Sequence, residues 1–93
     1  MMIVQFSRHA LEKIRRRGVN MSHVHQALRT PDELYEDVEH GTRIAVKKVN
    51  GRFIILAYRE EDEVAKVITL YYTTKFDRLV KSKTVRGAWK RIV

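Results

Sequence analysis

Three basic side chains near the start of the chain are spaced so that they share one face of a helix. His9, Lys13 and Arg16 lie four and three residues apart, and this spacing brings helical side chains together. The opposite face of the same segment is apolar and carries Ala10, Leu11 and Ile14. An imidazole titrates near neutral pH, and the two cations attract anions. The segment therefore predicts a helix with one face toward the core and one face suited to proton transfer on a bound phosphate group.

The other histidines and the carboxylates give no pattern typical of a metal site. His23 and His25 are two residues apart in a predicted helix, so their side chains diverge and do not bind one zinc ion together. His40 precedes Gly41, which indicates a solvated residue in a turn. The acidic residues between positions 32 and 39 lack the spacing of a metal-binding loop. We therefore expect no metal and no other cofactor.

The composition indicates a small, basic protein that binds nucleic acid. The chain has 93 residues, enough for one small domain, and a formal net charge of +8. Its pI of about 10.1 is typical of proteins that bind RNA or DNA. The alternative is a heavily solvated surface without a partner, since 32% of the residues are charged.

Three further observations predict a cytoplasmic protein without a membrane span. The chain has no cysteine, which excludes disulfides, cysteine-based zinc sites and thiol nucleophiles. Charged residues follow the first five residues, where a signal peptide would have an apolar run. The longest apolar run, residues 53–58, is far shorter than the about 20 residues that a membrane helix needs.

Signals at helix ends predict a tight helical hairpin in the first third of the chain. Ser7 is placed to cap the first helix, and Gly18 to end it in a left-handed conformation. Asn20 is placed to cap the second helix. Pro31 makes Thr30 an unfavourable helical residue, so the second helix is expected to end there.

The middle of the chain predicts an antiparallel meander. A short edge strand is expected at Leu34–Val38, followed by strands over residues 42–49, 52–59 and 64–72. The Asn50-Gly51 pair is a strong signal for a two-residue hairpin turn. That turn places Val46 opposite Ile55, and a four-residue turn over residues 60–63 places Ile55 opposite Ile68.

This register predicts one apolar and one basic face of the sheet. The apolar face carries Ile44, Val46, Phe53, Ile55, Ala57, Ile68 and Leu70. The other face carries Arg43, Lys47, Arg52, Tyr58, Thr69 and Tyr71. We expect the helices to cover the first face, which leaves the second open as a basic surface with tyrosines.

The C-terminal residues predict a basic amphipathic helix or arm. Val85, Trp89 and Ile92 are spaced as one side of a helix, with lysines and arginines around them. Two interpretations stay open, a last helix packed on the core and an arm that binds RNA or a protein partner. The predicted fold is thus α+β, with two N-terminal helices on one face of a three- to four-stranded antiparallel sheet. We expect one domain over residues 1–93, with a core of about 3–75 and an arm of about 76–93.

Four short motifs occur along the chain, Phe6-Ser7-x-His9-Ala10, Ile14-x-x-Arg17-Gly18-Val19, Ala27-Leu28-x-x-Pro31-Asp32 and Val67-Ile68-Thr69-Leu70-Tyr71. Together they resemble a group of short prokaryotic domains of unknown function that is similar in fold to RelE/ParE-type toxins. The resemblance covers about residues 6–75 and implies two N-terminal helices packed against an antiparallel sheet. RelE-type toxins cut mRNA on the ribosome with basic residues and Tyr or His on the exposed sheet face, whereas ParE-type toxins act on DNA gyrase. The motifs do not include the catalytic residues of either toxin, so the resemblance implies only a location, the open sheet face and the neighbouring helix edge.

The predicted function is that of a RelE-like toxin of a toxin–antitoxin system, a metal-independent ribonuclease or translation inhibitor that acts on RNA or the ribosome. The predicted catalytic residues are His9, Arg43 and Tyr71, since RNA cleavage needs a base, an acid and a cation near the phosphate. The predicted nucleic-acid-binding residues are Lys13, Arg16, Lys47, Arg52 and Lys75. An antitoxin would cover this surface, and a second copy could pair at the Leu34–Val38 edge. The alternative is a non-catalytic basic module that binds nucleic acid or protein.

Overall fold

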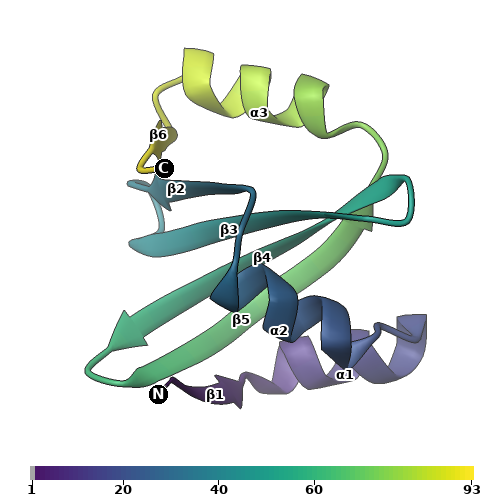
Figure 1. The fold of residues 1–93 in the computed structure, drawn as a ribbon. Helices are drawn as coiled ribbons and strands as arrows, with labels where there is room; N and C mark the ends of the chain where they lie inside the picture. Colours follow the sequence, from purple (N-terminus) through teal and green to yellow (C-terminus); the bar gives the residue numbers. More distant parts are fainter. Residues whose placement is uncertain (1) are drawn as a thin grey trace.

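The two N-terminal helices begin and end at the residues that the sequence indicates. In the computed structural model, which describes residues 2–93, they are α1 (Arg8–Arg17) and α2 (Met21–Arg29) (Figure 1). The Ser7 hydroxyl accepts the Ala10 backbone N–H at 3.0 Å, and the Asn20 side chain caps α2 in the same way at 2.8 Å. Gly18 ends α1 with a φ of 62°, which is unstrained without a Cβ. The predicted caps are confirmed, although Leu11, expected on the core side, is half-exposed.

One six-stranded mixed sheet forms the centre of the structure (Figure 1). Its strands are β1 (Ile3–Phe6), β2 (Glu33–Asp37), β3 (Thr42–Val49), β4 (Arg52–Glu61), β5 (Val64–Thr73) and β6 (Trp89–Arg91). They follow the order β1-β5-β4-β3-β2-β6, in which β1 and β5 are parallel and the other neighbours antiparallel. The predicted sheet of three to four antiparallel strands is therefore wrong. It omitted β1 and β6, which at four and three residues are too short to show a strand pattern in the sequence.

The β3–β4 hairpin has the predicted register. Val46 lies opposite Ile55, and the turn residues Asn50 and Gly51 have φ angles of 49° and 79°. Positive φ at both positions is the geometry of the turn that an Asn-Gly pair favours. Local turn chemistry therefore fixes this half of the meander.

The β4–β5 register differs from the prediction by three residues. Ile55 lies opposite Tyr71 instead of Ile68. Asp62 adopts a φ of 56°, and the turn after β4 is two residues long instead of four. A bulge between Ala57 and Tyr58 shifts the pairing by one more residue, since a bulge sets two residues against one.

The sheet has a separate hydrophobic core on each face. On the α1/α2 face, buried strand residues such as Ala45, Ile54 and Leu56 pack with α1 and α2. On the opposite face, which we call the α3 face, Ile44, Val46 and Ile55 pack with the C-terminal segment. The prediction of which sheet face lies under the N-terminal helices is therefore wrong, because α1 and α2 cover the face that carries Ile54 and Leu56. The face expected to lie under these helices is covered by a third helix, α3 (Phe76–Val85).

The C-terminal segment forms a helix and a strand instead of one long helix. Gly87 follows α3 with a φ of 78°, and the chain then continues into β6. Trp89 is 4% exposed in that strand, whereas Val85 is 80% exposed, so the predicted apolar stripe does not exist. β6 pairs with β2, so β2 is not the edge strand that was expected to pair with a second copy. Among residues 2–93, no helix is long and apolar enough to cross a bilayer.

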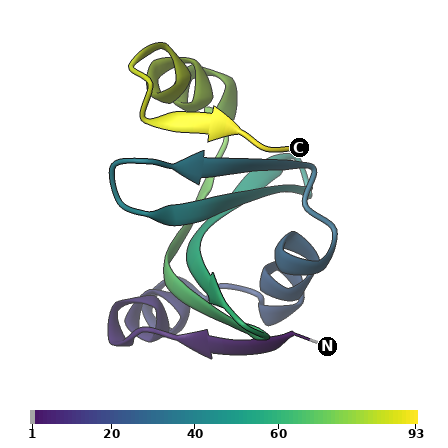
Figure 2. The same cartoon turned by 90° about the vertical axis from the view of Figure 1, so that its left-hand side faces the viewer.

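The sheet is strongly twisted, and its α3 face opens between two helices. Figure 2 shows α3 above the sheet and α1 below it on the same side of the view, with α2 on the other side. β1 pairs only with the first part of β5, Val64 to Val67. The chain then turns at Ser7, whose hydroxyl donates to the Ile68 carbonyl at 2.7 Å. This turn sets α1 beside the unpaired part of β5.

Candidate functional site

A hollow of about 320 Å³ lies on the α3 face between the sheet and α3. Its apolar lining comes from Ile44, Ile55, Ala57 and Ile68. Its polar and aromatic lining comes from Asp37, His40, Thr42, Arg59, Thr69, Tyr71, Lys83 and Trp89. We call this hollow the α3-face pocket. An apolar hollow with a few polar groups is typical of a ligand site.

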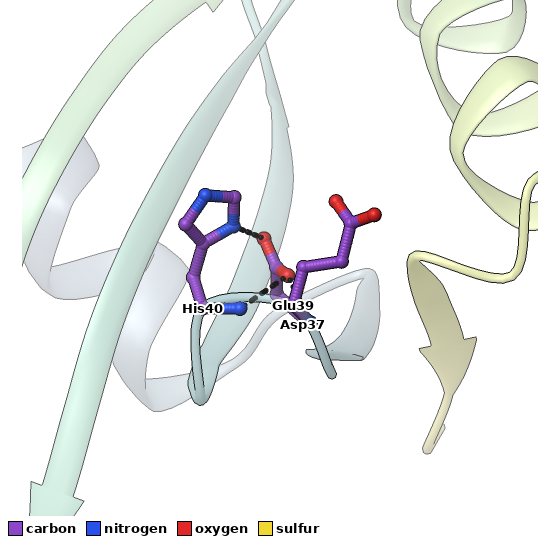
Figure 3. Close-up of side chains that lie close together, drawn as sticks. All are labelled: Asp37, Glu39 and His40. Carbon is purple, nitrogen blue, oxygen red and sulfur yellow. Dashed lines mark hydrogen bonds and ion pairs between the residues drawn. The ribbon is translucent and has the colours of Figure 1, made fainter.

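Asp37 and His40 form a hydrogen-bonded pair at the end of β2 (Figure 3). One carboxylate oxygen of Asp37 accepts the backbone N–H groups of Glu39 and His40, each at 3.1 Å. The other oxygen lies 3.0 Å from His40 Nδ1. Aspartate commonly accepts the N–H two residues later in a turn, so the local sequence favours this arrangement. The carboxylate is thereby held in place by three contacts.

The environment of Asp37 keeps its carboxylate ionised. Asp37 is only 7% exposed. Burial alone would raise the pKa of Asp37, but the side-chain and backbone hydrogen bonds of His40, with that of Glu39, outweigh it and lower the pKa. An ionised carboxylate beside Nδ1 favours the tautomer with its proton on that nitrogen. In that tautomer the lone pair of His40 is on Nε2, the ring nitrogen that does not contact Asp37, and the side chain is 67% exposed.

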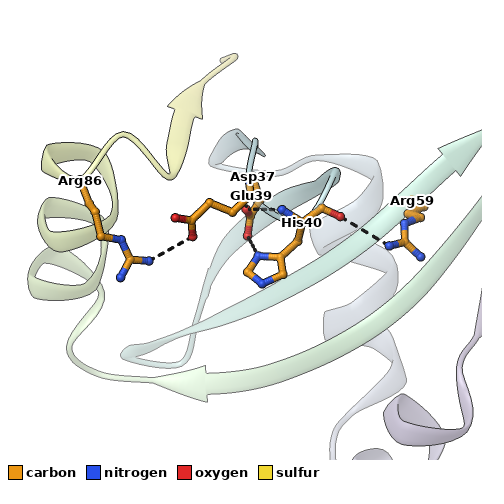
Figure 4. A network of polar contacts seen from close by, with 5 residues as sticks. All are labelled: Asp37, Glu39, His40, Arg59 and Arg86. Atoms are coloured by element: carbon orange, nitrogen blue, oxygen red, sulfur yellow. Dashed lines mark hydrogen bonds and ion pairs between the residues drawn. The ribbon is translucent and has the colours of Figure 1, made fainter.

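Two arginines flank the turn that carries this pair (Figure 4). Arg86 lies 3.4 Å from the Glu39 carboxylate, which ties the end of α3 to the turn. Arg59 donates to the His40 carbonyl at 3.5 Å, from β4 on the other side. Lys83, from α3, lies 5.9 Å from the centre of the Trp89 ring. Arg59 and Lys83 both line the pocket, so two cations lie at the same hollow as His40.

A third cation reaches the same face from α1. The Lys13 ammonium donates to the Thr69 hydroxyl at 3.1 Å and lies 5.7 Å from the centre of the Tyr71 ring. Burial, with the nearby charges of Arg17 and Arg16, lowers the pKa of Lys13. Burial raises the pKa of Tyr71, so its phenol stays protonated at neutral pH. Lys13 reaches this position because β1 leaves the second half of β5 unpaired.

The three predicted catalytic residues do not lie together. Tyr71 lines the pocket, and His9 is exposed on α1, one helical turn before Lys13. Arg43 lies on the α1/α2 face of the sheet, whereas the pocket lies on the α3 face. Arg43 pairs with Glu60 at 3.2 Å. The pocket thus contains one of the three residues.

The predicted nucleic-acid-binding residues are also dispersed. Lys13 contacts Thr69 and Tyr71, which line the pocket, and Arg16 is exposed on α1. Lys47 donates to the Thr30 carbonyl at 2.8 Å and lies 3.5 Å from Asp32, so it joins β3 to the loop after α2. Arg52 and Lys75 lie together at the far end of the sheet, beside Tyr72.

Apart from Tyr71, sequence reasoning missed the ionisable residues of the pocket, which are Asp37, His40, Arg59 and Lys83. The spacing Asp37-x-x-His40-Gly41 is the one signal that could have found the pair, since a carboxylate before a turn often accepts its N–H groups. Arg59 and Lys83 had no such signal, because their positions depend on the bulge in β4 and on the docking of α3.

Asp37, Glu39 and His40 also bring three ligand-type atoms within 4.8 Å of one another. These atoms are already engaged, since Asp37 binds His40 and two backbone N–H groups, and Glu39 pairs with Arg86. A cation here would have to displace Arg86 or the imidazole. The arrangement fits a hydrogen-bonded turn better than a metal centre.

These features define a small α+β protein in which a mixed sheet carries a histidine–aspartate pair beside a basic pocket. The chain belongs to the family described as Domain of unknown function (DUF4258), whose model matches residues 6–72. The expected membership in a domain family of unknown function is confirmed, whereas the likeness to toxins stays a prediction. No curated protein and no solved structure matches the chain. The matched residues include Asp37, His40, Arg59 and Tyr71.

Proposed function

We propose that the protein is a metal-independent endoribonuclease of the kind found in toxin–antitoxin systems, with its active site in the α3-face pocket. The observation that carries the proposal is the Asp37–His40 pair at the rim of an apolar hollow with cations around it. The apolar floor suits the flat face of a nucleobase, and the cations suit the phosphate. An antitoxin that blocks this activity would cover the same pocket.

The chemistry follows from RNA itself. His40 Nε2 takes the proton from a 2′-hydroxyl, which attacks the adjacent phosphorus. Lys13, Arg59 and Lys83 balance the charge that develops on the phosphate oxygens. The bond to the 5′-oxygen then breaks, and the Tyr71 phenol gives that oxygen its proton. The products are a 2′,3′-cyclic phosphate and a free 5′-hydroxyl.

Each residue has one physical reason for its role in this proposal. Asp37 is a positioning residue, because it fixes the tautomer and orientation of His40 and does not touch the substrate. Tyr71 is assigned as the acid because its phenol lines the pocket and is protonated at neutral pH. Lys13 belongs to the site because its ammonium lies beside Thr69 and Tyr71.

A cleavage assay in the presence of a chelator tests the proposal. Purified protein is incubated with single-stranded RNA and EDTA, and the ends of the products are identified by mass spectrometry. The wild type should give cyclic-phosphate ends, and His40→Ala should cut about 10²–10⁴-fold more slowly. His25→Ala, an exposed histidine on α2, is the matched control and should cut like the wild type. Equal rates for His40→Ala and the wild type would contradict the proposed role of His40.

The second candidate is a binding module without catalysis. It is favoured by one observation, the Arg52 guanidinium stacked on Tyr72 away from the α3-face pocket, because a basic and aromatic surface binds single strands without any chemistry. Binding of RNA without cyclic-phosphate products would support this candidate. Growth arrest on expression, relieved by His40→Ala, would support the ribonuclease.

A further inference from the structure

We propose that Arg52, Tyr72 and Lys75 form a second contact for the single-stranded RNA that also occupies the α3-face pocket. The inference deepens the proposed function and rests on it for the identity of the ligand, single-stranded RNA. We call this contact the flanking site. It lies at the end of the sheet that carries the Asn50-Gly51 turn.

Arg52 and Tyr72 form a stacked pair across β4 and β5. The Arg52 guanidinium carbon lies 3.7 Å from the centre of the Tyr72 ring. Tyr72 lies opposite Ile54, so it is a diagonal neighbour of Arg52 on the same face of the sheet. At this distance a guanidinium stacks on the ring, and Arg52 is exposed. Its outer side is therefore available to a nucleobase or a phosphate group.

The tyrosine in this pair is fixed before any ligand binds. Its hydroxyl accepts the Asn20 backbone N–H at 3.1 Å and lies 2.9 Å from His23 Nδ1. The His23 ring also meets the Tyr72 ring edge-on, with their centres 5.8 Å apart. A side chain held by several contacts loses little freedom on binding. The stack is thus a preorganised platform.

A hollow of about 350 Å³ beside the platform is lined by Arg52, Tyr72, Thr73, Thr74 and Lys75. Its two cations, Arg52 and Lys75, are not neutralised by a neighbouring carboxylate of the described chain. Arg43, Lys47, Arg86 and Arg91 each lie within 3.5 Å of a carboxylate, whereas neither Arg52 nor Lys75 is in an ion pair among residues 2–93. Unpaired cations beside an aromatic ring are the groups that bind single-stranded nucleic acid.

The C-terminal part of β5 contributes a tyrosine to each of the two hollows. Tyr71 and Tyr72 are consecutive in this strand, so their side chains lie on opposite faces. Tyr71 lines the α3-face pocket, and Tyr72 lines the second hollow. β5 ends at Thr73, one residue after Tyr72, so a ligand that contacts both tyrosines must bend around this end of the sheet. Duplex RNA is too stiff for that path, so the proposed ligand is single-stranded.

Fluorescence anisotropy with 2′-O-methyl RNA, which cannot be cleaved, tests the flanking site. Labelled oligomers of about three and about eight nucleotides are compared, since single-strand sites span several nucleotides. The double variant Arg52→Gln with Lys75→Gln should bind the longer oligomer about tenfold more weakly and the shorter one like the wild type. Its slope of log affinity against log salt should be smaller by about 0.7 for each lost phosphate contact. Lys48→Gln with Lys66→Gln, two exposed strand lysines, is the matched control and should leave both affinities unchanged.

Two results would overturn the inference: equal affinity of the double variant and the wild type for the longer oligomer, or an equal loss in the control. The assay is independent of cleavage. If the wild type does not cut unmodified RNA but its binding still depends on Arg52 and Lys75, the ribonuclease proposal fails and the flanking site stands. If the wild type cuts RNA and the double variant binds normally, the ribonuclease stands and the flanking site fails.

Discussion

The two faces of the sheet are covered in different ways. On the α1/α2 face, α1 contributes buried Ala10 and α2 contributes Val24, Ala27 and Leu28, and the strands beneath them are buried. On the α3 face, α3 buries only Phe76, with Leu79 and Val80 half-buried. Part of that face is left as the pocket that contains His40 and Tyr71. The α1/α2 face therefore mainly stabilises the fold, whereas the α3 face carries the polar groups that we propose act on a ligand.

The largest loss of stability should come from truncating a leucine on the α1/α2 face. Leu56 is fully buried, so Leu56→Ala should lower the free energy of unfolding by about 2–5 kcal/mol. The same substitution at half-buried Leu79 in α3 should cost clearly less, because part of the side chain already contacts water. Urea denaturation of both variants measures the difference. Equal losses would mean that the two faces contribute alike to stability.

The next largest loss of stability should follow a substitution of the glycine after α3. Gly87 has a φ of 78°, so Gly87→Ala should cost about 1–2 kcal/mol through backbone strain. Hydrogen exchange should show that β6 opens before the strands under α1 and α2. Ser82→Ala introduces the same residue at an exposed position inside α3, so it controls for an alanine in this segment without backbone strain. Uniform exchange in all strands would argue against a separate α3 unit.

A smaller effect should appear in the pH dependence of stability. Hydrogen bonds lower the pKa of Asp37 below its ordinary 3.8, so the unfolded chain binds this proton more readily than the folded chain. The stabilisation is therefore complete above about pH 4, and it is lost as the pH falls through the lowered pKa of the folded state. Asp37→Asn should flatten this part of the stability curve, measured by urea denaturation at a series of pH values. A curve as steep as that of the wild type would contradict the role of this carboxylate.

The smallest effects should come from exposed basic residues outside the pocket. Arg43 pairs with Glu60 on the surface, so Arg43→Gln should change stability by about 0–1 kcal/mol. Arg43→Gln and His9→Ala should both cut RNA at the wild-type rate, in the assay used for His40. A loss of cleavage in either variant would instead support the catalytic residues predicted from the sequence.

Local chemistry explains which parts of the fold could be predicted. The caps at Ser7 and Asn20 and the turn at Asn50-Gly51 depend on residues next to one another, and all three are present. The β4–β5 register depends on a bulge that no single residue in the sequence marks. Trp89 has helical spacing with Val85, but Gly87 ends the helix between them and places Trp89 in a strand.

The candidate site was harder to predict because it is built from distant segments. Tyr71 was a predicted site residue, whereas Arg59 and Lys83 were not, and His40 was expected to be a solvated turn residue. Its role depends on Asp37 three residues earlier and on α3, which follows more than 30 residues later in the chain. The pairing of His40 with Asp37 is local, but the pocket beside it is not.

An NMR titration with a short 2′-O-methyl RNA tests most directly whether the ligand binds on the α3 face of the sheet. The resonances of His40 and Tyr71 and the indole N–H of Trp89 should shift as RNA is added, together with those of Lys13 and Thr69. Buried residues under α1 and α2, such as Val24 and Ala45, should not move. Shifts confined to the surface around Arg43 and Lys47, with the pocket unchanged, would contradict the account.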